Sequence, residues 1–128
     1  MSQIYLSQKD KNFLATWYEP RIIDNTKIWK DTFWDWFFGL FGNQAVTLNK
    51  TIYISINAPL NNDKKYLVLL AHEFYHVVEQ YKYGWWKYLF KYVKNFPRYW
   101  KQPYLHPMEK SAYERGEEAS KLLIHHNG

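Results

Sequence analysis

The sequence predicts an α+β fold, in which a small antiparallel sheet packs against a central helix and a second, C-terminal helix. Three observations predict it. Residues 45–48 and 51–56 are rich in alternating β-branched side chains on either side of Asn49-Lys50, which is typical of a hairpin. Residues 63–83 carry apolar side chains over most of a helical circumference. A last helical stretch starts near Met108 and runs to about Ile124.

The central helix has clear start and stop signals. Asn62 or Asp63 can cap its N-terminus, and Gly84 ends it. Because its apolar residues leave little room for a polar face, we expect this helix to be central and buried.

The 128 residues predict a single domain, with a helical and aromatic segment over 1–43 before a catalytic core over 44–128. Within the first segment, a helix is expected in residues 8–20, ending before Pro20. An aromatic helix is expected over residues 27–41, broken around Gly39 and Gly42.

Composition and simple sequence patterns bear on the possible metal ligands, the location and the partners of the protein. The chain has no cysteine, so any metal must be held by histidine and carboxylate rather than thiolate. The N-terminal sequence lacks the pattern of a signal peptide, and no apolar run approaches the roughly 20 residues that span a bilayer. We therefore expect a soluble, cytoplasmic protein. The net charge of +5 favours an anionic partner only weakly.

The stretch "LLAHEFYHVVEQ", residues 69–80, places His72, Glu73 and His76 in an otherwise apolar helix. Residues four apart lie on one helix face, so the two imidazoles can reach one zinc ion. Glu73 lies about 100° further round, where it can reach an attacking water without binding the metal. The alternative is a pair of core histidines bonded to backbone, with Glu73 at a wet edge. Because burying all three groups without partners is costly, we favour the metal.

A catalytic zinc needs a third protein ligand. The downstream candidates are His106, Glu109, Glu114, Glu117, Glu118, His125 and His126. Glu109 is preferred, because it opens the last helix and shares a face with small residues, Ala112 and Gly116, that allow close packing on the motif helix. Glu117 is the second choice.

The pair of segments "HEFYHVVEQ" and "HPMEKSAYERGEEA" resembles the gluzincin zinc metallopeptidases, in particular their smallest members, the minigluzincins. The resemblance spans roughly residues 44–120 and implies a zincin-like fold. It implies that His72, His76 and Glu109 bind one zinc per chain and that Glu73 is the general base. In many members an acidic residue follows the third ligand by one turn and orients a histidine; here that position is Tyr113, so this group must come from elsewhere or be a hydroxyl.

The resemblance implies hydrolysis of a peptide or protein by zinc-activated water, with an extended substrate along the Thr51–Ile56 strand as a sheet edge. Four residues near Glu109 could stabilise the oxyanion: Tyr99, Tyr104, His106 and Tyr113. We prefer Tyr113 and His106, which lie within four residues of Glu109. The alternative of the same class is a zinc domain that binds peptide without cleaving it.

Residues 85–100, "WWKYLFKYVKNFPRYW", permit a different function, that of a surface-binding module. Lysines 87, 91 and 94 share one helix face, and Trp86, Leu89, Phe90 and Val93 share another. This pattern suits an anionic membrane surface or, as the less favoured partner, single-stranded nucleic acid. We prefer an ordinary amphipathic helix whose aromatic residues lie in the core. Exposure decides: burial of Trp85, Trp86, Phe90 and Trp100 together would exclude the membrane.

Overall fold

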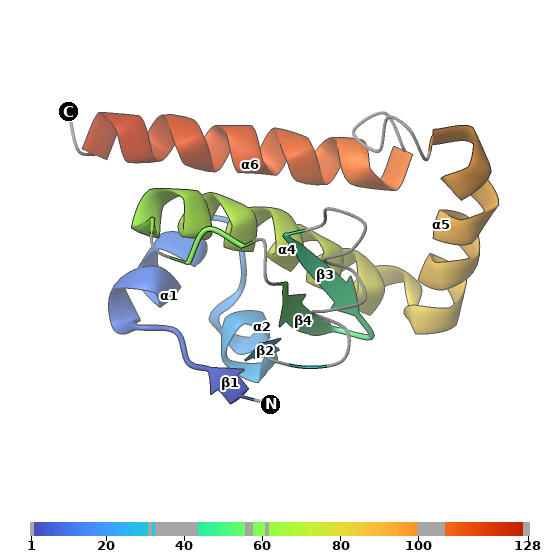
Figure 1. Cartoon of the computed structure of the whole chain (residues 1–128), viewed down its shortest axis with the longest axis horizontal. Helices are drawn as coiled ribbons and strands as arrows, with labels where there is room; N and C mark the ends of the chain where they lie inside the picture. The colour runs from blue at the N-terminus through green and yellow to red at the C-terminus, as the bar shows by residue number, and fades with distance from the viewer. Residues whose placement is uncertain are drawn as a thin grey trace.

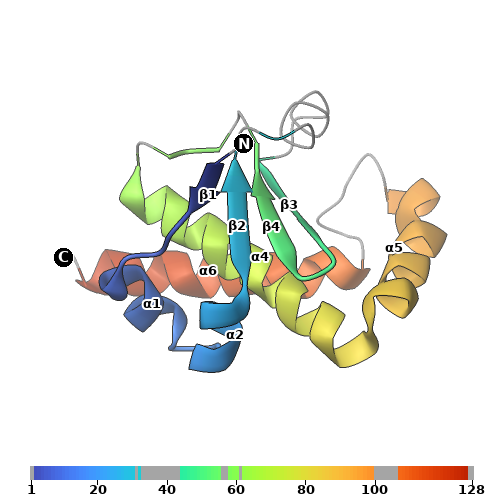
Figure 2. The ribbon, with the colours of Figure 1, turned by 90° about the horizontal axis from the view of Figure 1, so that it is seen from below.

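The computed structural model describes residues 2–30, 32, 44–55, 58–60, 62–99 and 107–126. Its four-stranded sheet has the order β1 (Ser2–Ile4), β2 (Lys27–Lys30), β4 (Thr51–Ile54) and β3 (Ala45–Leu48) (Figure 2). The outer pairs are antiparallel, whereas β2 and β4 run parallel. The predicted α+β class is confirmed, with a sheet that is mixed rather than wholly antiparallel.

The predicted hairpin of β3 and β4 is confirmed. Val46 pairs with Tyr53 and Thr47 with Ile52. Asn49 and Lys50 between the strands have φ of 47° and 64°, and two consecutive positive φ values are those of the tight turn that matches the strand twist.

The prediction that Thr51–Ile56 is an edge strand is wrong. β4 is hydrogen-bonded to β2 on one side and to β3 on the other. Among the described strands, the edges of the sheet are β1 and β3. The local pattern of residues 51–56 marks a strand, but it carries no information about a neighbour that arrives from more than twenty residues upstream. Ile56 itself lies outside the described residues.

The N-terminal segment contributes both helices and strands. The helix expected before Pro20 is α1 (Gln8–Leu14), capped by the Ser7 side chain, and α2 (Pro20–Asn25) follows. The helix expected from residue 27 is wrong over Lys27–Lys30, which form β2. Ile28 is fully buried there opposite Ile52, so pairing with β4 overrides the helical spacing of the aromatic residues. Residues 33–43, with both glycines, lie outside the described residues.

The central helix is α4 (Asp63–Tyr83), and its predicted bounds and caps are confirmed. The Asn62 side chain accepts a hydrogen bond from the Lys65 N–H, and Gly84 with φ 81° ends the helix. α4 lies between the sheet and α6 (Pro107–His126) (Figure 1). The hydrophobic core therefore surrounds it, with residues from both sides of position 43: Leu14, Tyr18, Ile23, Ile28, Ile52, Ile54, Leu67, Leu70, Ala71, Phe74, Val77, Ala119 and Leu123.

Small residues bring α6 close to α4, as the sequence indicates. Ala112 and Ala119 are fully buried. A Cβ built on Gly116 would lie 3.5 Å from Val68 Cγ1 and 4.0 Å from His72 Cβ, so the two helices are in van der Waals contact beside the motif. This contact sets the distance between the motif histidines and the start of α6.

Beyond Gly84, α5 (Trp85–Tyr99) turns out of the line of α4 and lies at one end of the molecule (Figures 1 and 2). The interpretation that its aromatic residues are core is wrong for Trp86 and Phe90, which are exposed; among the aromatic side chains of α5 that the structure describes, Tyr88 is the buried one. Trp85 is half-buried, and Trp100 lies outside the described residues. Of the helices described, none has both the length and the apolarity needed to cross a membrane.

Candidate metal centre

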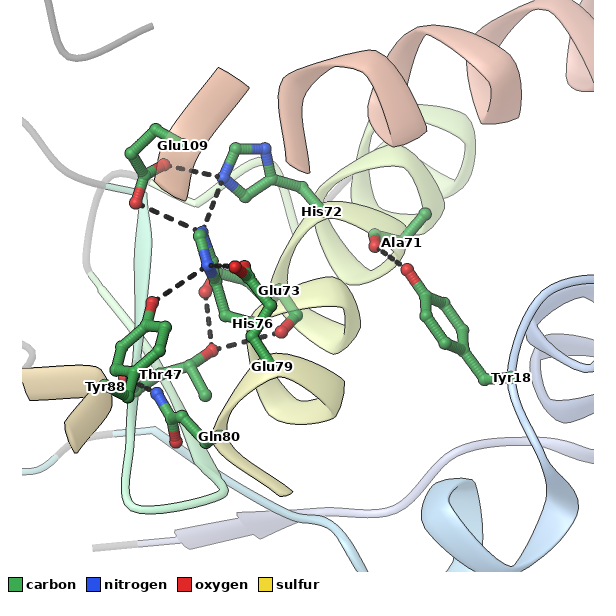
Figure 3. Close-up of polar contacts among 10 residues, drawn as sticks. All are labelled: Tyr18, Thr47, Ala71, His72, Glu73, His76, Glu79, Gln80, Tyr88 and Glu109. Carbon is green, nitrogen blue, oxygen red and sulfur yellow. Dashed lines mark hydrogen bonds and ion pairs between the residues drawn. The ribbon is translucent and has the colours of Figure 1, made fainter. Parts of the chain in front are cut away.

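Two helices bring His72, His76 and Glu109 together (Figure 3). Glu109 Oε2 lies 3.2 Å from His72 Nε2, and its Oε1 lies 3.1 Å from His76 Nε2. The two Nε2 atoms are 3.3 Å apart. Both histidines come from one face of α4, and Glu109 lies in the first turn of α6, so the packing of the two helices assembles the cluster.

These separations fit a zinc ion. Ligand atoms about 2.0–2.1 Å from a tetrahedral zinc lie roughly 3.3–3.4 Å from one another. The two Nε2 atoms are separated by about this distance, each lies 3.1 or 3.2 Å from a different oxygen of Glu109, and one ligand atom from each of the three residues lies within 4.8 Å of the others. Two imidazole nitrogens and one carboxylate that converge in this way are satisfied together by a cation at their centre.

The structure brings Glu109, and not the second choice Glu117, to the histidines. Glu117 is exposed on α6. Glu114 and Glu118 are exposed as well, and Glu118 instead accepts a hydrogen bond from the Trp17 indole. The face that carries Ala112 and Gly116 is thus the one that points to α4, which is the reason Glu109 reaches the motif.

Two residues that the sequence did not indicate contact the Nδ1 atom of His76, on the side of the ring away from the cluster. This Nδ1 lies 3.3 Å from Glu79 Oε1 and 3.0 Å from the Tyr88 hydroxyl (Figure 3). A carboxylate on Nδ1 favours the tautomer with the proton there, which leaves Nε2 with a free lone pair for a metal. These residues occupy the role that the resemblance left open at position 113. The spacing of Glu79 from His76, one helical turn, was the available signal; Tyr88 had none.

Glu73 is buried beside the cluster without belonging to it. The Thr47 hydroxyl donates a 2.7 Å hydrogen bond to Glu73 Oε2. Thr47 is itself buried on β3, and the Gln80 side chain on α4 donates to its carbonyl at 3.0 Å. The hairpin therefore fixes the carboxylate of Glu73. A threonine at an inward position of a short strand was the only sequence sign of this contact.

The charges of the cluster are coupled in the metal-free protein. Burial alone would lower the pKa of His76, but the surrounding carboxylates, above all Glu109, raise the pKa well above its usual value. Burial also disfavours the charged form of Glu109, which would raise the pKa of its carboxyl group. The two neighbouring histidines outweigh this effect, so the pKa of Glu109 lies well below its usual value. The site therefore favours a cation, either a proton on His76 or a metal.

Tyr113 lies next to the cluster, one turn after Glu109. Its ring packs edge-on against the His72 ring, with centroids 4.6 Å apart, and its side chain is partly exposed. Burial, and then Glu109 and Glu73, raise the pKa of its hydroxyl, which keeps it protonated and able to donate. His106 and Tyr104 lie outside the described residues, as does the side chain of Tyr99.

Comparison with protein families agrees with this geometry. Residues 26–96, more than half of the chain, match the model of the family DUF5700, described as "Putative zinc dependent peptidase". The chain belongs to the DUF5700 family. The match contains the motif residues His72, Glu73 and His76 and ends before Glu109, so membership supports a zinc-peptidase family without reaching the third residue of the cluster. Searches of curated proteins and of solved structures found no match.

Proposed function

We propose that this DUF5700 protein hydrolyses peptide bonds, with one zinc ion per chain held by His72, His76 and Glu109. The observation that carries the proposal is the convergence of one ligand atom from each of the three residues, all within 4.8 Å of one another, beside the buried Glu73. Two motif histidines with a glutamate from a later helix are the gluzincin ligand set, and the family description supports zinc-dependent peptidase chemistry.

In this proposal a bound zinc supplies a Lewis acid that polarises the scissile carbonyl and lowers the pKa of a water to about 7. Glu73 takes the proton of the attacking water and returns it to the leaving amine. Thr47 donates a 2.7 Å hydrogen bond to one oxygen of Glu73, which fixes the carboxylate, and the other oxygen would face the water. Glu79 and Tyr88 keep His76 in the tautomer that binds through Nε2.

Tyr113 is the proposed oxyanion donor. It lies against His72 at the partly exposed side of the cluster, and its hydroxyl stays protonated. A neutral donor held in place before the reaction stabilises developing negative charge most effectively.

The proposed substrate is an extended peptide added to the edge of β3 rather than along β4. β4 has strand neighbours on both sides, whereas β3 is an edge among the described strands. β3 also carries Thr47, which bonds to Glu73. A strand added there would run beside the proposed base, and main-chain hydrogen bonds would supply the affinity.

The deciding experiment compares Glu73→Gln with Glu109→Ala and Glu117→Ala, in zinc content and in cleavage of a peptide library. We expect Glu73→Gln to retain its zinc and to lose cleavage by about 10²–10⁴-fold. Glu109→Ala should lose zinc, whereas the exposed Glu117→Ala, its matched control, should keep both zinc and activity. Zinc retained by Glu109→Ala would refute the ligand set. Stoichiometric zinc in a wild type that cleaves nothing would favour the peptide-binding alternative.

A further inference from the structure

α5 carries an exposed apolar stripe, Trp86, Phe90 and Val93. Their exposed fractions are 78%, 69% and 58%. Positions i, i+4 and i+7 lie in one line along a helix, so the three side chains form a continuous strip rather than scattered contacts. An exposed strip of large apolar side chains marks an interaction surface.

The stripe cannot simply turn inward. Tyr88, on the opposite side of α5, is buried and its hydroxyl lies 3.0 Å from His76 Nδ1. Its ring also lies against those of Trp85 and His76. A rotation of α5 that buried Trp86 would withdraw the Tyr88 hydroxyl from His76. The orientation that supports the cluster is therefore the one that exposes the stripe.

The basic excess of the chain falls in the stretch of sequence that contains this stripe. Residues 80–108 contain six Lys or Arg and no Asp or Glu. The remaining residues contain 11 basic and 12 acidic side chains, so their net charge is −1, against +5 for the chain. On α5, Lys87 and Lys94 are exposed next to the stripe, and Lys91 lies over the Tyr83 ring at 4.3 Å. The whole basic excess thus falls in the stretch of sequence that contains the stripe, where Lys87 and Lys94 are exposed beside it.

We propose that α5 binds an anionic lipid surface, with the stripe inserted among the headgroups and the flanking lysines on lipid phosphates and carboxylates. An interfacial helix combines these features: aromatic and aliphatic side chains along one line and cations beside them. Lysine stems can lie along the apolar region while their ammonium groups stay at the charged surface. Single-stranded nucleic acid fits less well, because it binds by stacking successive bases on rings and Val93 has none. The inference is independent of the proposed peptidase activity.

The test is flotation of the full chain with phosphatidylcholine vesicles that contain or lack phosphatidylserine. One variant removes the apolar anchors, Trp86→Ser with Phe90→Ser, and another reverses the charges, Lys87→Glu with Lys94→Glu. Their matched controls are the equally exposed Tyr5→Ser and the double change Lys9→Glu with Lys64→Glu, elsewhere on the surface. Circular dichroism and zinc content are measured for every variant, because all the changed side chains are exposed and should leave the fold intact.

We expect the wild type to float with phosphatidylserine vesicles and the affinity to fall as salt is raised. Each α5 variant should bind at least about tenfold more weakly, the lysine variant because it loses attraction to the anionic surface and the Trp86 and Phe90 variant because it loses the apolar area inserted among the headgroups. The controls should bind like the wild type.

Failure of the wild type to bind, equal binding to neutral vesicles, or an equal loss in the controls would each overturn the proposal. Tighter binding to a single-stranded oligonucleotide than to vesicles would assign the surface to nucleic acid instead. Sedimentation that reveals a dimer, lost with Trp86→Ser and Phe90→Ser but not with the lysine changes, would assign it to a second copy of the chain. None of these results depends on whether the protein cleaves peptides.

Discussion

The helices α4 and α5 are consecutive in sequence, but α4 buries polar side chains whereas α5 exposes large apolar ones. α4 buries His76, Glu73 and Gln80, each with hydrogen-bond partners, whereas α5 exposes Trp86 and Phe90. Buried polar groups are costly unless they are paired, and large exposed apolar groups are uncommon on a surface without a partner. Both departures from the usual pattern thus point to binding: one to a cation, the other to a surface.

Helical periodicity in the sequence identifies a helix, but it does not tell which faces of that helix are buried. On α4, apolar side chains cover nearly the whole circumference, so burial follows from the sequence. On α5, the apolar residues fall on more than one face, and the side that carries Tyr88 is the one buried against His76.

The largest expected effect is a difference in the free energy of unfolding between two variants, each of which removes one phenylalanine, from α4 or from α5. Phe74 on α4 is fully buried and Phe90 on α5 is mostly exposed. Phe74→Ala should lower the free energy of unfolding by about 3–5 kcal/mol, because it leaves a cavity in the core. Phe90→Ala should change it by less than about 0.5 kcal/mol. Urea unfolding of both variants measures this, and similar losses would mean that α5 packs its stripe inside the protein.

Gly84 joins the two helices, and its backbone, φ 81° and ψ 150°, suits glycine alone. Gly84→Ala should destabilise the fold by about 1–3 kcal/mol through strain, because nothing lies within 4 Å of the added Cβ to clash with it. The control is Gly116→Ala, where the Cβ meets ordinary contacts and the helix should gain up to about 1 kcal/mol. Thermal unfolding distinguishes the two; a neutral Gly84→Ala would contradict the described junction.

The contact between α5 and α4 can be tested at a single oxygen. Tyr88→Phe keeps the ring and removes the hydroxyl that lies 3.0 Å from His76 Nδ1. Zinc affinity should fall about 10–100-fold, as for other groups that orient a metal-binding histidine. Competition with a chelator measures the change, and Tyr81→Phe, exposed on α4, is the matched control. An unchanged affinity would mean that, among the described residues, Glu79 alone orients His76 through its Nδ1.

A smaller effect is expected from pH on the α4 site. Glu109 and the other carboxylates raise the pKa of His76 well above its usual value, against the opposing effect of burial, so a proton competes with zinc for this imidazole up to a higher pH than at an ordinary histidine. Zinc requires the neutral imidazole, so binding should release this proton and apparent affinity should rise with pH, by up to about tenfold per unit, until the His76 pKa is passed. Calorimetry in two buffers of different ionisation enthalpy counts the proton. An affinity independent of pH would contradict the pairing of His76 with Glu109.

Many features of the hairpin and of α4 could be predicted from the sequence, because the residues that determine them are close together in the chain. The hairpin turn at Asn49-Lys50, the cap at Asn62 and the stop at Gly84 each depend on a few adjacent residues. The i, i+4 histidines lie on one face of any helix. The preference for Glu109 over Glu117 likewise followed from the small residues on its face of α6.

The remaining features depended on contacts between distant segments. The central helix, the hairpin and the chemistry of the motif followed from the residues alone, since these depend on local backbone conformation and residue type. Only the tertiary structure decided that Lys27–Lys30 form a strand beside β4, that Thr47 and Tyr88 support the cluster, and that Trp86 and Phe90 face outward. These outcomes depend on which surfaces meet after folding, and burial against a particular neighbour outweighs the weak preferences of a local segment.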